Sequence, residues 1–182
     1  MSPSDPAAPP EVIPEPGWTP IEPPRLEGGR GSFVSGDPEG DRLRVRYFRR
    51  ADDLRLVGKA WFGPGAGGPP GHAHGGSIAA VLDEAMGAAA WTAGHVVVAV
   101  RLDTSFQRML PLGTDATLEA WVDRVDGRKV WTRGRLLDAG GETFATAEAL
   151  FVKLDPVRFG PLLERVAAAL GVEVEKLIDQ NR

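Results

Sequence analysis

Hydrophobic and polar residues alternate along much of the chain after residue 41, which is the period-two pattern of half-buried β-strands. Two such strands come early and four come late, with hairpin signals at Asp126-Gly127 and Gly140-Gly141 between late ones. The late strands are therefore expected to be antiparallel neighbours. The predicted strands span residues 42–49, 54–62, 96–106, 115–124, 129–137 and 143–154.

One apolar helix separates the two groups of strands, and the pattern predicts it from about Gly75 to Ala93, with Gly94 as its C-terminal cap. At about 100° per residue, its largest apolar side chains share one face. A helix of this apolarity needs a sheet to cover it. The sequence therefore predicts an α+β fold in which a long central helix is wrapped by a curved antiparallel β-sheet. The expected core face contains Ile78, Leu82, Ala85, Met86 and Ala89.

Two acids lie in this apolar helix, in different surroundings. Glu84 falls nearly opposite the core face and is expected to be solvated, whereas Asp83 falls at its edge among small residues such as Ala79 and Gly87. An enclosed carboxylate is costly to desolvate and is therefore a candidate for chemistry. The unpaired amides at the helix start favour an anionic or carbonyl oxygen nearby. The alternative, that both acids are simply solvated, stays open.

The chain has 182 residues, which suits one domain with tails. Its first part is rich in proline and glycine and reads either as an extended arm pinned by Trp18, Ile21 and Leu26 or as a disordered leader. The last part, from Pro161 through Asp179, is predicted to form one or two short helices. The predicted arm, central domain and C-terminal helical extension are residues 1–40, 41–156 and 157–182.

Composition narrows the function classes. A net charge of −4 argues against a dedicated partner among nucleic acids or anionic membranes, and the absence of cysteine excludes disulfides, thiolate catalysis and cysteine-type metal centres. No apolar run approaches the ~20 residues that span a bilayer. Residues 1–5 lack the basic and apolar regions of a signal peptide, so a cytoplasmic location is expected.

The strongest motif is Gly68-Pro69-Pro70-Gly71-His72-Ala73-His74-Gly75-Gly76, continued to Leu82-Asp83. It resembles the signature of hotdog-fold acyl-CoA thioesterases, in the branch that contains the carboxyl-terminal modulator protein and is akin to the phenylacetate-pathway enzymes. The likeness continues at Phe106-Gln107-Arg108, at Gly127-Arg128-Lys129 and at 148–154, so it covers roughly residues 43–156.

The resemblance implies hydrolysis of acyl-CoA thioesters without a cofactor. Asp83 matches the catalytic acid, His74 the motif histidine, and Gly75 or Gly76 the amide that polarises the carbonyl. Asp83 would attack directly or activate a water. Many relatives carry a hydroxyl residue where this chain has Ala99. That departure keeps open a second hypothesis, a non-catalytic acyl-CoA-binding or interaction module.

Helix geometry adds a constraint of its own. Asp83 lies seven residues after Gly76, about 10 Å along the axis, so one carbonyl carbon cannot contact both. Either the loop folds back, or the acid of one subunit meets the amides of another, which a two-fold dimer makes natural. The resemblance implies a site between subunits as well. The sequence therefore predicts a homodimer or a dimer of dimers.

Other candidate residues carry less specific signals. Arg108, Arg128 and Lys129 are either ligands of the coenzyme A phosphates or ordinary solvated charges. His72, His74 and His95 lack a nearby carboxylate, so no metal site is expected. Ser77 lies outside a nucleophile elbow and is expected to be a helix cap or a first-turn residue. Four tryptophans are expected to fill the packing between sheet and helix: Trp61, Trp91, Trp121 and Trp131.

Overall fold

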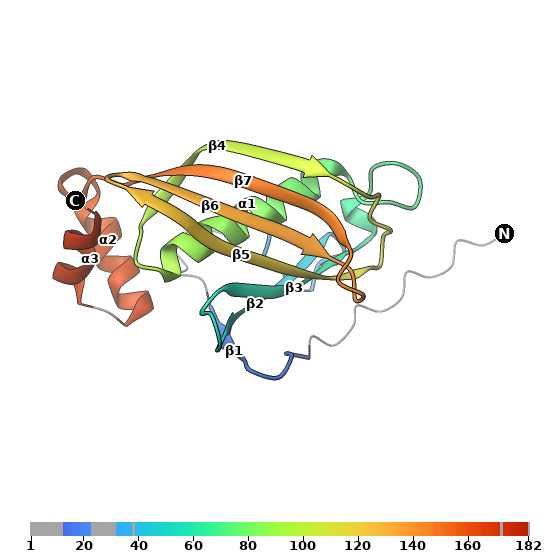
Figure 1. The fold of residues 1–182 in the computed structure, drawn as a ribbon, viewed down its shortest axis with the longest axis horizontal. Coiled ribbons are helices and arrows are strands. Elements are labelled where there is room, and N and C mark those ends of the chain that lie inside the picture. The colour runs from blue at the N-terminus through green and yellow to red at the C-terminus, as the bar shows by residue number, and fades with distance from the viewer. Residues whose placement is uncertain (1–12, 23–31, 38, 172, 182) are drawn as a thin grey trace.

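The computed structural model describes residues 13–22, 32–37, 39–171 and 173–181 (Figure 1). Within them, a single long helix, α1 (Gly75–Thr92), lies against a sheet, and a short 3₁₀ turn (Pro64–Ala66) precedes it. Two further helices follow the sheet, α2 (Pro156–Leu170) and α3 (Val174–Asn181). The strands are β1 (Trp18–Ile21), β2 (Leu43–Arg50), β3 (Leu56–Phe62), β4 (Val97–Phe106), β5 (Asp115–Asp126), β6 (Lys129–Leu137) and β7 (Thr143–Lys153).

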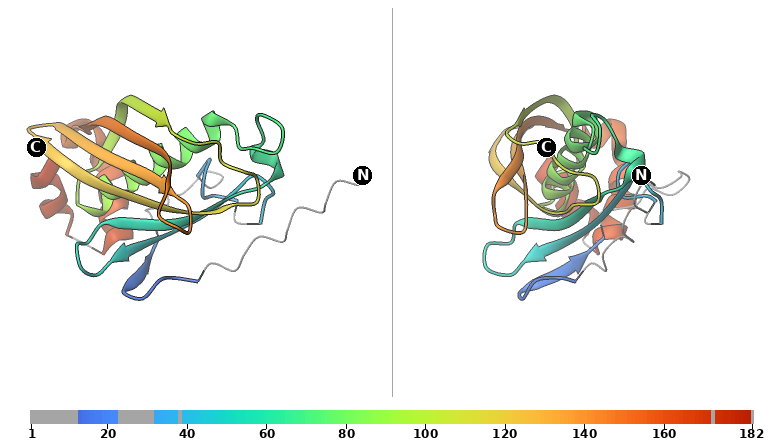
Figure 2. Two further views of the ribbon diagram at one scale, coloured as in Figure 1. Left: turned by 45° about the vertical axis from the view of Figure 1, so that its right-hand side comes forward. Right: turned by 90° about the vertical axis from the view of Figure 1, so that its right-hand side faces the viewer.

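The strands form one antiparallel sheet in the order β1-β2-β3-β5-β6-β7-β4. The end-on view in Figure 2 shows this sheet curving around α1. The α+β prediction of a central helix wrapped by a curved antiparallel sheet is therefore confirmed.

The core lies between α1 and the inner face of the sheet. The predicted core face of the helix is fully buried there, including Leu82 and Met86 at 0% exposure. Gly134 on β6 permits this close approach, because a Cβ at that position would lie 3.2 Å from Met86 Cγ and 3.3 Å from Leu82 Cδ2. A side chain at this position would therefore have to push Met86 and Leu82 aside by a few tenths of an ångström.

The two edges of the sheet differ sharply. The four-residue β1 pairs with β2 and contains Pro20, which cannot donate to a further strand. The ten-residue β4 pairs with β7 alone among the described strands, and apolar Val98, Val100 and Leu102 are exposed along it. β4 is therefore the edge that is open to another chain.

The strand β1 was not predicted, although part of the pinned-arm interpretation is confirmed. Trp18 packs against Phe48 with ring centroids 5.6 Å apart, and Ile21 packs against the main core. Leu26 lies outside the described residues.

The expected place of the tryptophans is wrong for three of the four. Trp61, Trp121 and Trp131 each follow an inward-facing core residue on their strands, so alternation turns them to the outer face. There they lie under Arg44, Arg55 and Arg124, at 5.2, 4.4 and 3.8 Å from the ring centroids.

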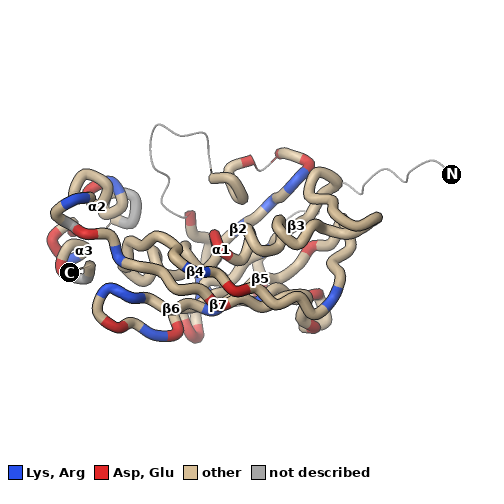
Figure 3. The backbone as a smooth tube through the Cα atoms, turned by 90° about the horizontal axis from the view of Figure 1, so that it is seen from above, with Lys and Arg blue, Asp and Glu red and all other residues tan. Residues whose placement is uncertain are grey.

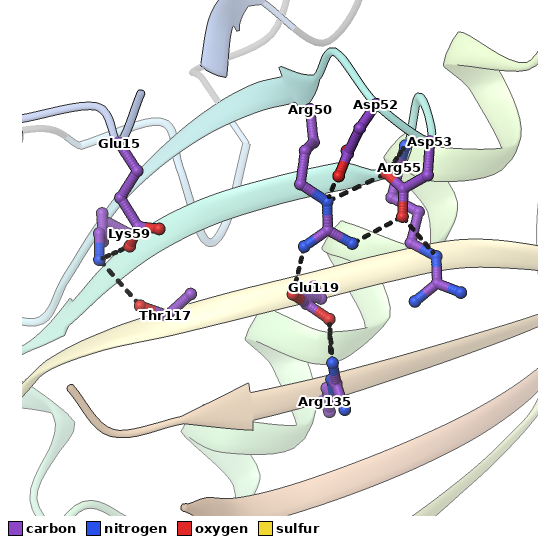
Figure 4. Close-up of polar contacts among 9 residues, drawn as sticks. All are labelled: Glu15, Arg50, Asp52, Asp53, Arg55, Lys59, Thr117, Glu119 and Arg135. Atoms are coloured by element: carbon purple, nitrogen blue, oxygen red, sulfur yellow. Dashed lines mark hydrogen bonds and ion pairs between the residues drawn. The ribbon is translucent and has the colours of Figure 1, made fainter. Parts of the chain in front are cut away.

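The outer face also carries an ion network around the buried Glu119 (Figure 4). Its carboxylate accepts from Arg50 Nη1 at 2.7 Å and from Arg135 Nε at 2.8 Å, and Arg50 also binds Asp53 at 2.6 Å. Paired charges of this kind allow a carboxylate to be buried on a sheet face that none of the described helices covers.

The C-terminal helices pack against each other beside the end of α1 and the start of β4. The fully buried Asn181 joins these helices to the segment between α1 and β4 by hydrogen bonds. Its amide accepts from Val96 N–H at 2.9 Å and donates to the carbonyls of Gly94 at 3.0 Å and Leu177 at 2.7 Å. No helix among the described residues is long and apolar enough to cross a membrane.

Candidate active site

The glycine-rich loop before α1 is held in one conformation by its backbone. Ala73 N–H donates to Leu110 O at 2.8 Å, His74 N–H donates to Ala66 O at 2.8 Å, and His72 bridges to Pro111. Gly71 adopts φ +73°, a backbone that residues with side chains rarely take. The loop therefore delivers the start of α1 to a fixed place beside β4.

His74 is the N-cap of α1, and its Nδ1 accepts the amide N–H of Gly76 at 2.9 Å. The amides of Ser77 and Ile78 turn back to His74 O. The amide of Gly75 donates to no group that the structure describes. Of the two candidate amides, Gly75 is therefore the one left available, and Gly76 is already engaged.

A cavity of about 280 Å³ opens at this helix start, and Gly75 lines it. The backbone at Gly75 lies close to β4, since a Cβ there would be 3.3 Å from the ring of Phe106. The residue with the available amide thus lines a hollow large enough to hold part of a small molecule.

Asp83 is half-buried and makes no hydrogen bond or ion pair with any described residue. Burial raises the pKa of its carboxyl above the ordinary aspartate value. Apart from Glu84, α1 contains no other charged residue (Figure 3). An unpaired, partly desolvated carboxylate is what a general base or nucleophile requires.

The expectation for Glu84 needs correction. It is half-buried, not fully solvated, and its Oε1 accepts the hydroxyl hydrogen of Tyr47 at 2.9 Å. Burial, and then the charge of Glu84, raise the pKa of the Tyr47 phenol. The alternation in β2 could have placed Tyr47 on the inner face, but no local pattern pairs it with a residue 37 positions away.

Gly75 and Asp83 are eight residues apart on one straight helix, so their separation along the axis is about 12 Å. Gly75 and Gly87 of α1 lie close to Phe106 of β4 and Phe151 of β7, respectively. Around the helix axis the two glycines are about a third of a turn apart, and Asp83 lies between them. Asp83 therefore lies on the side of the helix towards β4, too far from its own Gly75 to share one substrate atom.

The predicted phosphate ligands are not brought together within one chain. Arg108 lies at the α1 start, where its guanidinium binds Asp138 at 2.8 Å and the carbonyls of Thr143 and Glu142. Arg128, in the β5–β6 turn, and Lys129, the first residue of β6, lie at the opposite end of the sheet beside the C-terminal helices (Figure 1). Arg128 donates to Lys153 O at 2.9 Å.

The remaining candidates are scattered. His72 Nδ1 lies 2.8 Å from Pro70 O, and His95 lies beyond the other end of α1. No group of three or more potential metal ligands occurs among the described residues. Ala99 is exposed on β4, while Thr104, further along that strand, has a buried hydroxyl with no partner among the residues described.

Comparison with known proteins identifies the domain that contains the candidate site. The Thioesterase superfamily profile matches residues 70–145, which contain the loop, α1 and most of the following strands. The chain contains a thioesterase-superfamily domain. The hotdog fold expected from the sequence is thereby confirmed, and with it the resemblance carried by the glycine-rich motif.

Two curated relatives of this domain are named acyl-coenzyme A thioesterase THEM4. The bovine (Bos taurus) protein is 30% identical over 125 residues, covering 68% of this chain and 52% of the relative. The Xenopus laevis protein is 32% identical over 121 residues, covering 66% and 54%. The chain thus spans about half the length of the curated relatives it matches.

Solved structures agree on the fold. The thioesterase superfamily protein RHA08564 is 33% identical, with a TM-score of 0.56 over 60% of this chain and 54% of that one. The Escherichia coli PaaI protein is 17% identical, with a TM-score of 0.55 over 60% and 79%, and supports the thioesterase domain's fold alone.

Proposed function

We propose that this protein hydrolyses acyl-CoA thioesters at a site formed between two copies of the chain, with Asp83 as the catalytic carboxylate. The observation that carries the proposal is Asp83 itself, a half-buried acid without a partner among the described residues of an apolar helix. The curated relatives are named for this activity, and they align with this chain over 125 and 121 residues.

The chemistry follows from two groups. The carboxylate of Asp83 either attacks the thioester carbonyl or removes a proton from the attacking water, and the amide N–H of Gly75 stabilises the oxyanion that forms. The C–S bond then breaks and coenzyme A leaves as the thiol. Its sulfur takes up the proton that Asp83 removed from water, or, on the direct route, a proton delivered during hydrolysis of the acyl-enzyme.

Two features support the dimer: the open β4 edge of the sheet, and the separation of about 12 Å between Gly75 and Asp83 along α1. Pairing of β4 with β4 of a second copy would cover the exposed Val98, Val100 and Leu102 and would bring the Gly75 amide of one copy towards Asp83 of the other. It would also bring the Arg128 and Lys129 end of one sheet towards the Arg108 end of its partner, where coenzyme A phosphates could be held. A dimer of dimers, the cytoplasmic location and the lack of nucleic-acid or membrane partners stay predictions of the sequence.

A subunit-mixing experiment tests the shared site. Asp83→Asn removes the carboxylate, and Gly75→Pro removes the amide N–H at the first helical position, where proline is tolerated. His74 already has φ −68° and ψ 136°, the extended backbone that a following proline requires. Each homodimer should lose about 10²-fold or more in kcat.

Co-expression of the two variants then separates the alternatives. Random pairing makes about half of the dimers mixed, and each mixed dimer holds one intact site, so about a quarter of the wild-type activity should return. A site contained within one chain would give no recovery, and that result would refute the proposed arrangement.

A second function, binding of acyl-CoA without turnover, is favoured by one observation. Ala99 stands where the resemblance to the thioesterase family implies a hydroxyl side chain. Steady-state hydrolysis of several acyl-CoAs decides between the two, because a binding module would show tight binding of coenzyme A esters and no release of thiol.

A further inference from the structure

The cavity at the start of α1 has a lining that identifies which part of a thioester it accepts. Its walls are largely hydrocarbon: Ile78 comes from the first turn of the helix, and Phe106, Met109 and Leu110 come from the end of β4 and the segment after it. The rings and chains of Phe106 and Met109 are 53% and 58% exposed, so they form its rim and not its floor. Leu110 and Ile78 are buried beneath them.

The charge in this lining is already neutralised. Arg108 is its one basic side chain apart from the ring of His72, and the guanidinium is held by the Asp138 carboxylate at 2.8 Å and by two backbone carbonyls. Arg108 also stacks over Phe144 at 4.5 Å, which fixes its plane. A carboxylate placed in the cavity would therefore lose water without gaining a free cation.

The pantetheine arm is a less suitable occupant, because the lining offers it few available polar atoms. The side-chain amide of Gln107 is already hydrogen-bonded to Thr146 Oγ1 at 3.0 Å, and the amide of Gly75 is a single donor. The amides and hydroxyl of the arm need hydrogen-bond partners, and pockets bind such groups through a few available polar atoms. An apolar acyl chain or ring needs none, and Phe106 offers a ring edge or face to it.

Building on the proposed function, we propose that this cavity is the acyl subsite, that Phe106 and Met109 are its specificity-determining residues, and that the substrates are coenzyme A esters of neutral, apolar acids. Aliphatic and aryl acyl groups are accepted. Acyl groups that end in a carboxylate, such as those of dicarboxylic acids, are excluded.

The test measures kcat/KM for acetyl-, hexanoyl-, phenylacetyl- and glutaryl-CoA on the full-length protein. Phe106→Ala should reduce the preference for hexanoyl- or phenylacetyl-CoA over acetyl-CoA by about tenfold or more, because it removes contacts that the acetyl group does not make. Val157→Ala, a substitution of a 95% exposed residue on α2, is the matched control and should leave the ratios unchanged.

A second variant is expected to gain activity towards one ester relative to another, a result that partial unfolding could not produce. Met109→Arg places an unneutralised cation at the rim and should raise the ratio of glutaryl- to hexanoyl-CoA hydrolysis by about tenfold. If both variants hydrolyse the esters as fast as the wild-type protein does, with the wild-type ratios of kcat/KM between esters, the inference is overturned and the proposed function stays intact. A uniform rise in KM for all four esters would assign the cavity to the pantetheine arm and would likewise overturn it. No hydrolysis of any ester by the wild-type protein would remove the proposed function and this inference together.

Discussion

Replacement of Asp83 by asparagine should separate activity from stability in one step. Asparagine keeps the shape of the side chain but cannot take a proton at neutral pH. Loss of a general base lowers kcat by about 10²–10⁴-fold. That range corresponds to about 3–5 kcal/mol of transition-state stabilisation, and release of free thiol from acyl-CoA measures it directly.

The thermal stability of Asp83→Asn, in contrast to its activity, should not fall at neutral pH. Because burial raises the pKa of Asp83 in the folded protein, its protonated form favours folding at low pH, and this contribution is lost as pH rises through the folded pKa. Above both the folded and unfolded pKa, the ionised carboxylate is a cost that asparagine does not carry. Asp83→Asn should therefore melt at or above the wild-type temperature at pH 7–8 and lose that advantage near pH 3.

The neighbouring acid provides the control. Glu84→Ala leaves the buried hydroxyl of Tyr47 without its 2.9 Å partner, which should lower the free energy of unfolding by about 1–3 kcal/mol while most activity remains. In wild type, kcat/KM should rise with pH along an acid limb above the ordinary aspartate pKa. Wild-type turnover in Asp83→Asn, or a loss of stability in it at neutral pH, would refute the assignment of Asp83 as the unpaired catalytic acid.

Three further predictions concern the packing of α1 on the sheet, the hydrogen bonds of Asn181 and the assembly of the dimer. Gly134→Ala should lower the free energy of unfolding by about 1–3 kcal/mol in urea melts, because its Cβ would lie 3.2 Å from Met86 Cγ; an unchanged midpoint would contradict this. Asn181→Ala should cost about 1–3 kcal/mol and speed amide exchange at Val96, whose N–H loses its partner. Val100→Lys should convert dimers to inactive monomers in sedimentation experiments, and an active dimer would rule out assembly through β4.

The sequence predicted the sheet and α1 well because both carry long, regular periodicities. The alternation over residues 42–49 locates β2 (Leu43–Arg50) to within one residue, and the apolar helix from Gly75 ends within one residue of its predicted C-terminus. It did not reveal β1, since Trp18–Ile21 has too few residues for a period and contains a proline. That strand forms only because β2 offers an edge, which is a tertiary effect.

The geometry around the candidate site residues could be predicted only in part, again for a physical reason. A motif can name Gly75, Gly76 and His74, but only the fold shows that His74 Nδ1 takes the Gly76 amide and leaves that of Gly75 available. The sequence also did not predict the hydrogen bond to Glu84, because its donor Tyr47 lies 37 residues away and reaches Glu84 across the core. Long-range pairing of polar groups leaves no local pattern.

The two edges of the sheet bear on the proposed dimer. If both edges were open, pairing could continue from chain to chain, and the protein would risk filaments. The short, proline-bearing β1 blocks one edge, whereas β4 offers ten residues with exposed valines and leucine beside Asp83 and Gly75. Pairing through β4 alone would close after two copies and create two equivalent clefts. Under the proposed function, the apolar edge, costly for a monomer, is the surface that supplies each Asp83 with a neighbour's amide.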